Sequence, residues 1–102
     1  MIIKKKQSLS KKQIKFTKKV GLLINYATSL GYGLTFGDAY AKKGHKKHSF
    51  HYKRLAIDLN LFLDGKYLVK TNDHLPLGLF WESIGGSWGG RWDDGNHYSF
   101  GE

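Results

Sequence analysis

The sequence predicts an α+β fold: a small, mainly antiparallel sheet with two helices. Two segments carry apolar residues at helical spacing, and the stretch between them alternates as a β-strand does. Helices that flank short strands joined by tight turns are typical of this fold class. A chain of 102 residues fits one domain, so we expect residues 1–102 to form a single domain. The basic residues 1–9 are expected to fray.

The first helix is predicted over residues 11–30. Its apolar residues share one helical face: Phe16, Val20, Leu23, Ile24, Ala27 and Leu30. Ser10 and Gln13 have the spacing of a capping box, and Gly31 is a suitable stop. The helix also carries five lysines, which we interpret as a solvated face.

The central strand is predicted from Arg54 to about Phe62. Its core side is entirely aliphatic: Leu55, Ile57, Leu59 and Leu61. Asp58 then lies on the opposite, more open face. His51 precedes Asp58 by seven residues, an odd separation that would place it on the wrong face of a continuous strand. We therefore expect His51 in the turn that leads into the strand.

The remaining elements are shorter. Residues 33–40 are predicted as a strand interrupted at Gly37, and residues 63–66 as a hairpin turn into a strand at 67–69. Asp73 is expected to cap a helix running to about Ile84, with His74 at the surface of its first turn. Residues 87–92 and 97–101 are predicted as the last strands. Gly89 and Gly90, which Trp88 and Trp92 flank, could let a peptide backbone approach.

Composition narrows the function classes. Seventeen Lys and Arg against eight Asp and Glu give a net charge of +9, which favours polyanions such as nucleic acid or anionic wall polymers. There are no cysteines, so any metal must be held by histidine and carboxylate. No apolar stretch is as long as that of a signal peptide or of a membrane-spanning helix. We expect a cytoplasmic, monomeric protein.

Three residues could form a metal site. His51, Asp58 and His97 offer two imidazoles and one carboxylate, and a zinc hydrolase needs three protein ligands with one open position. Each of the three would by itself be an ordinary polar residue. An alternative set combines His51 with His45 and His48, but Gly44 and the following strand argue against the helix that this set needs.

The motif Ser49-x-His51-x-x-Arg54-x-Ala56-x-Asp58 carries a family resemblance. It resembles the Ser-x-His-x-x-Gly-x-Ala-x-Asp signature of the zinc D,D-peptidases related to VanX, VanY and the L-alanyl-D-glutamate endopeptidases. That group, peptidase family M15, includes many phage endolysins, and residues 59–66 are similar to the phage branch.

The C-terminal half supplies the expected partner motif, Trp88-Gly89-Gly90 followed by Asp94-x-x-His97. The resemblance covers roughly residues 31–100 and implies a hedgehog/DD-peptidase-like fold.

The resemblance implies a Zn²⁺ peptidase that hydrolyses a bond of the peptidoglycan stem peptide. His51, Asp58 and His97 would be the zinc ligands. An acidic residue at the position of Asp94 acts as general base in this family, and Asp93 is the competing candidate. Within the resemblance, we expect cleavage between L-alanine and D-glutamate, with removal of a terminal D-alanine as the alternative. The protein would reach the wall after membrane permeabilisation.

Three residues are expected to contact substrate. Ser49 matches a family position that helps to hold the peptide, although closing a loop is an equally good interpretation. Trp92 flanks the predicted groove. Arg54 stands at a Gly-like position of the signature and could supply the oxyanion-stabilising charge that related enzymes take from an arginine after the Asp-Ala-Tyr strand. Ala41 stands there instead, so a lysine, Arg91 or zinc alone could also bear that role.

A rival hypothesis is a basic nucleic-acid-binding module without catalysis. It explains the charge of +9 and the lysine-rich helix. It does not explain the paired His/Asp motifs, so we expect no specific nucleic-acid partner.

Overall fold

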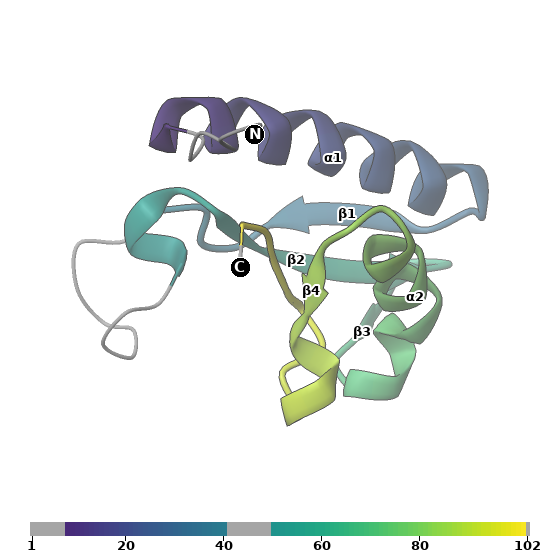
Figure 1. The fold of residues 1–102 in the computed structure, drawn as a ribbon. Coiled ribbons are helices and arrows are strands. Elements are labelled where there is room, and N and C mark those ends of the chain that lie inside the picture. The colour runs from purple at the N-terminus through teal and green to yellow at the C-terminus, as the bar shows by residue number, and fades with distance from the viewer. Residues whose placement is uncertain (1–7, 41–49, 102) are drawn as a thin grey trace.

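The fold is α+β, as predicted. The computed structural model describes residues 8–40 and 50–101 (Figure 1). Its α-helices are α1 (Leu9–Ser29) and α2 (Leu75–Ser83), and its strands are β1 (Gly33–Phe36), β2 (Ala56–Leu63), β3 (Lys66–Leu68), β4 (Ser87–Trp88) and β5 (His97–Ser99). Three 3₁₀ turns complete it: η1 (Phe50–Lys53), η2 (Thr71–His74) and η3 (Gly89–Trp92). Ser49, His45 and His48 lie outside the described residues.

Helix α1 begins earlier than the sequence predicted. Its N-cap is Ser8, whose extended backbone suits a cap and whose hydroxyl accepts from the Lys11 N–H at 3.3 Å. The predicted Ser10 cap is therefore wrong. Gln13 does not reach back to the cap but donates from Nε2 to the Lys53 carbonyl at 2.8 Å. It thereby ties α1 to η1. No helix in the described part of the chain is long and apolar enough to cross a bilayer.

The core lies between the sheet and the two helices. The four aliphatic residues predicted for the core face of β2, namely Leu55, Ile57, Leu59 and Leu61, are all buried. Helix α1 covers them along its length (Figure 1) with Phe16, Val20, Leu23 and Ala27. Trp81 of α2 is fully buried, and its ring meets Phe16 and Tyr98 edge to face at centroid distances of 5.9 and 6.0 Å. The predicted core face is confirmed.

Strand β2 is the centre of the sheet. Strand β1 pairs with one edge of β2, over residues 59–62. The other edge is shared: β5 pairs with residues 56–58, and β3 pairs with residues 61–63. Between the residues of β2 that pair with β5 and those that pair with β3, a backbone hydrogen bond runs from Leu59 N to the Asn96 carbonyl at 2.9 Å. This shared edge separates β3 from β5 beside the candidate site.

The hairpin between β2 and β3 forms as predicted. Asp64 and Gly65 both have positive φ, 51° and 75°, which is the requirement of a type I′ turn. The first strand is shorter than predicted and ends at Phe36. The chain still follows β2 beyond it, since the Asp38 carbonyl accepts from Asp58 N at 2.8 Å.

The predicted strand over residues 87–92 is wrong in its second half. Only Ser87 and Trp88 are extended, and residues 89–92 form η3. A Cβ on Gly89 would lie 2.2 Å from the Asp94 carbonyl oxygen, and one on Gly90 would lie 2.2 Å from the Trp88 ring. These two glycines therefore permit a tight internal turn, rather than the approach of a substrate backbone that we expected.

Candidate active site

His51 is fixed in the turn that precedes β2. It lies in η1 and is 1% exposed. The turn is held from outside by the Gln13 bond to the Lys53 carbonyl, and from within by Arg54 N donating to the His51 carbonyl at 3.4 Å. Its Nε2 lies 3.2 Å from Asp58 Oδ1. The expectation that His51 lies in the turn before the strand is confirmed, and its ring bends back toward Asp58.

Asp58 and His97 form a directly opposed pair on β2 and β5. Opposed residues of antiparallel strands project from the same face, so their side chains meet. His97 Nδ1 lies 3.6 Å from Asp58 Oδ1, and the two histidine rings are 5.1 Å apart in an edge-to-face arrangement. Candidate ligand atoms of all three residues lie within 4.8 Å of one another.

The donor set fits a small divalent cation. Zinc bonds of about 2.0–2.1 Å at tetrahedral angles place neighbouring ligand atoms roughly 3.3–3.4 Å apart. The two distances to Asp58 Oδ1, 3.2 and 3.6 Å, lie on either side of that value. Imidazole and carboxylate are also the donors that zinc takes in hydrolases without cysteine. His51, Asp58 and His97 could therefore hold a metal ion.

Asp94 is held by its backbone and has an exposed side chain. Its N–H donates to the Gly89 carbonyl at 2.9 Å, and its own carbonyl accepts from His97 N at 3.1 Å. No hydrogen bond or ion pair of its carboxylate is found among the described residues. A Cβ added at Gly89 would also lie 2.7 Å from the His97 Cβ, so this turn packs tightly against His97. Asp94 is thus fixed next to a metal-ligand candidate while its carboxylate remains open to solvent.

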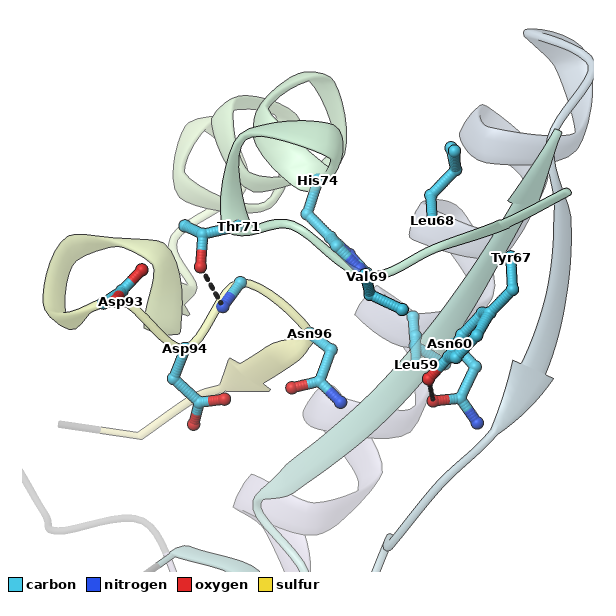
Figure 2. A pocket seen from close by; sticks show the side chains of 11 residues that line it. Leu59, Asn60, Tyr67, Leu68, Val69, Thr71, His74, Asp93, Asp94 and Asn96 are labelled. Atoms are coloured by element: carbon cyan, nitrogen blue, oxygen red, sulfur yellow. Dashed lines mark hydrogen bonds between the residues drawn. The ribbon is translucent and has the colours of Figure 1, made fainter.

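Asp93 has a different role in the turn. It caps η3 in the left-handed conformation, with φ 61°, as expected of a turn-forming aspartate. Figure 2 shows its carboxylate pointing to a different side from that of Asp94. In the described part of the chain, Asp93 forms no ion pair with Arg91, which lies two residues before it. Arg91 instead forms a two-bond pair with Glu82, at 2.8 and 2.6 Å, which lowers the pKa of Glu82.

The three tryptophans divide between core and surface. Trp81 and Trp88 are buried, whereas Trp92 is 53% exposed. The Trp92 ring lies 5.9 Å from the His97 ring, so it forms an exposed apolar wall beside the metal-ligand candidates. This placement keeps Trp92 as a candidate substrate contact. The Arg91 alternative for oxyanion stabilisation loses support, because the Arg91 guanidinium is engaged by Glu82.

Arg54 adopts a backbone conformation that favours glycine, the residue that the resembled signature has at this position. Its φ is 56°, a left-handed conformation that costs a residue with a Cβ about 1–2 kcal/mol. The conformation turns the chain from η1 into β2 directly after His51. The exposed Arg54 guanidinium stacks on the Tyr40 ring, 4.1 Å from its centroid. The stacking holds the Arg54 side chain next to the end of η1, the turn that contains His51.

We predict that Arg54→Gly is more stable than Arg54→Ala by about 1 kcal/mol. Both variants lose the contact with Tyr40, but only glycine relieves the left-handed strain. Urea unfolding of the two variants measures the difference. Equal stabilities would show that the backbone here is not strained. If Arg54 contacts substrate, both variants should raise KM to a similar extent.

The expectation that His74 lies at the surface is wrong. His74 is 2% exposed, and its Nδ1 lies 2.8 Å from the hydroxyl of Tyr98, which is fully buried. Burial lowers the pKa of His74, against a smaller opposing effect of Asp73, and burial raises the pKa of Tyr98. The spacing from His74 to Leu77 and Trp81, three and seven residues, could have revealed this buried face.

Comparison with known families identifies the family of the chain. A family model described as D-alanyl-D-alanine carboxypeptidase, of the M15 peptidases, matches residues 43–100. The match covers more than half of the chain and includes His51, Asp58, Asp94 and His97. The chain belongs to this peptidase family. No curated protein and no solved structure matches the chain.

Proposed function

We propose that the protein is a zinc-dependent peptidase of the bacterial cell wall, which hydrolyses a bond of the peptidoglycan stem peptide as endolysins do. The observation that carries the proposal is that His51 and His97 both approach the same carboxylate oxygen, Oδ1 of Asp58. A simple His–Asp hydrogen bond would need only one of the histidines. The second nitrogen, 3.6 Å from the same oxygen, is better explained by a shared cation.

Each residue then has a defined task. His51, Asp58 and His97 would hold the metal, and the chemistry that zinc supplies in such a set is to polarise a carbonyl and to lower the pKa of water to about 7. The Asp94 carboxylate takes a proton from the attacking water and passes it to the leaving amine. Trp92 and Arg54 lie on the accessible side and contact the peptide. Ser49, outside the described residues, is proposed to hold the peptide as well.

The bond between L-alanine and D-glutamate is our first choice of substrate, because the motifs around β2 are similar to the phage branch. Removal of a terminal D-alanine is the second candidate, and the description of the matching family favours it. Digestion of purified walls followed by mass analysis of the products distinguishes the two. A new amino terminus on glutamate supports the first candidate, and released alanine supports the second. Undigested walls with zinc present would argue against both.

The net charge of +9 suggests how the protein stays on its substrate. Lys11, Lys15 and Lys18 are exposed on α1. We predict that salt weakens adsorption to whole walls, because charges at the surface are screened within about 10 Å at 0.1 M. Hydrolysis of a short soluble stem peptide should change little over the same range. Tight, specific binding to duplex DNA, together with no binding to walls, would favour the nucleic-acid hypothesis instead.

A further inference from the structure

A pocket of about 190 Å³ opens where β3 and β5 share the edge of β2 (Figure 2). It borders the candidate metal ligands, since Leu59 follows Asp58 and Asn96 precedes His97 in the sequence. Sites for drug-sized ligands are larger, about 300–1,000 Å³. The size of this pocket therefore suits one side-chain group rather than a whole ligand.

The buried part of the pocket offers a hydrogen-bond donor. His74 lines it, and no hydrogen bond of His74 Nε2 is found among the described residues. The other ring nitrogen, Nδ1, is engaged by the Tyr98 hydroxyl at 2.8 Å. No second acceptor for this buried hydroxyl is found in the described part of the chain, so its proton is satisfied only by donation to Nδ1. That assignment leaves the His74 proton on Nε2, available to the pocket.

The rest of the lining combines polar side chains with Leu59, Leu68 and Val69, and it contains no cation. Asn60 and Asn96 contribute amides, and Asn60 Oδ1 accepts from the Tyr67 hydroxyl at 3.4 Å. Asp93 and Asp94 are the charged residues of the lining, and it includes neither lysine nor arginine. A ligand carboxylate would be repelled by these two aspartates. An ammonium group could not accept from His74 Nε2. A carboxamide matches both requirements, because it accepts through oxygen and donates through nitrogen.

The pocket is at the right distance from the candidate metal site. Asn60 lies two residues beyond Asp58 on β2 and on the same face, a separation of roughly 6.5–7 Å along the strand. One residue of extended peptide spans about 3.3–3.6 Å. The backbone of the residue next to the scissile bond covers about half of this separation, and its side group has to cover the rest to reach the pocket.

We propose that this pocket is a specificity subsite that selects a carboxamide over a carboxylate on the residue that follows the scissile bond. The proposal rests on the proposed function, in which that residue is D-glutamate. Its second carboxyl group is outside the cleaved bond and can be free or amidated. His74 Nε2 donates to the amide oxygen, and the side-chain oxygens of Asn60 and Asn96 are the acceptors for the amide nitrogen.

Two measurements test the subsite. The first compares kcat/KM for two soluble peptides that differ only in a free or an amidated carboxyl on the glutamate residue. We expect the amidated peptide to be preferred by about 10-fold or more, as the loss of one hydrogen bond and a repulsion between charges would give. The second follows binding of the same peptides by NMR, through the His74 ring and the side-chain amides of Asn60 and Asn96. This readout does not require hydrolysis.

Two substitutions of His74 separate recognition from packing. His74→Asn places an amide near the Nδ1 position, so it can keep the bond to Tyr98 while it removes the donor in the pocket. His74→Gln places an amide near the Nε2 position and has the opposite effect. We expect His74→Asn to abolish the preference for the amidated peptide. His74→Gln should retain it, even where the protein becomes less stable.

The outcomes distinguish the subsite from the activity. Hydrolysis of both peptides at equal rates, or equal binding of both, would overturn the subsite and leave the peptidase function intact. Preferential binding of the amidated peptide without hydrolysis of either would support the subsite and overturn the proposed reaction. A preference that survives in His74→Asn would also overturn the proposal, because the selecting donor would then lie elsewhere.

Discussion

Asp94→Asn should retain the fold and the metal while losing most of the hydrolytic activity. The substitution keeps the size and polarity of the side chain and removes its capacity to accept a proton. General acid–base groups contribute about 10²–10⁴-fold to the rate, so kcat should fall within that range. Because the Asp94 backbone holds the turn through Gly89 and His97, and its carboxylate has no bond among the described residues, stability should change little. Steady-state hydrolysis of a soluble stem peptide measures the loss.

The neighbouring aspartate provides the test of position. Asp93→Asn makes the same chemical change one residue earlier, on a side chain that points elsewhere (Figure 2). It should cost far less activity than Asp94→Asn. Asp64→Asn is the matched control, since Asp64 lies in the β2–β3 turn at φ 51°, which asparagine also tolerates. If Asp93→Asn abolishes activity while Asp94→Asn retains it, the base has been assigned to the wrong residue.

The central strand could be predicted from the sequence because its pattern is local and unambiguous. Four aliphatic residues alternate with Ala56, Asp58 and Asn60, and only a strand with one buried face accounts for that order. The same alternation shows that His51 and Asp58 cannot meet along a continuous strand. The structure resolves this conflict with η1, as expected. Side-chain period thus predicts that His51 lies outside the strand, and η1 brings its ring back to Asp58.

What the sequence did not predict depends on contacts between distant segments. His74 is polar and lies near a helix start, where histidine is ordinarily exposed, and its burial depends on Tyr98, 24 residues away. The pocket follows from two strands that share one edge of β2, and no local pattern encodes that arrangement. The N-cap was misassigned because Ser8 and Ser10 are equivalent by residue type, and only the extended backbone of Ser8 distinguishes them.

His97→Ala should abolish stoichiometric zinc binding. Wild-type protein is expected to keep about one zinc per chain after dialysis against a weak chelator, and the variant to keep none. Binding should also weaken at acid pH, because imidazole must be neutral to ligate a metal. Elemental analysis of the dialysed proteins measures both effects. His97→Gln, which keeps more of the contact with Trp92, should lose zinc as well, so the loss would not reflect packing alone.

The metal should also stabilise the fold, since a ligand that binds only the folded state raises the free energy of unfolding by about 2.7 kcal/mol at 100 times its Kd. Added zinc should therefore raise the Tm of the wild type and leave that of His97→Ala unchanged. His45→Ala and His48→Ala test the alternative ligand set and should keep both the zinc and the increase in Tm. Wild-type protein that stays metal-free when zinc is offered at neutral pH would contradict the proposed mechanism. Retention of zinc by His97→Ala together with its loss in His48→Ala would move the site to the alternative histidines.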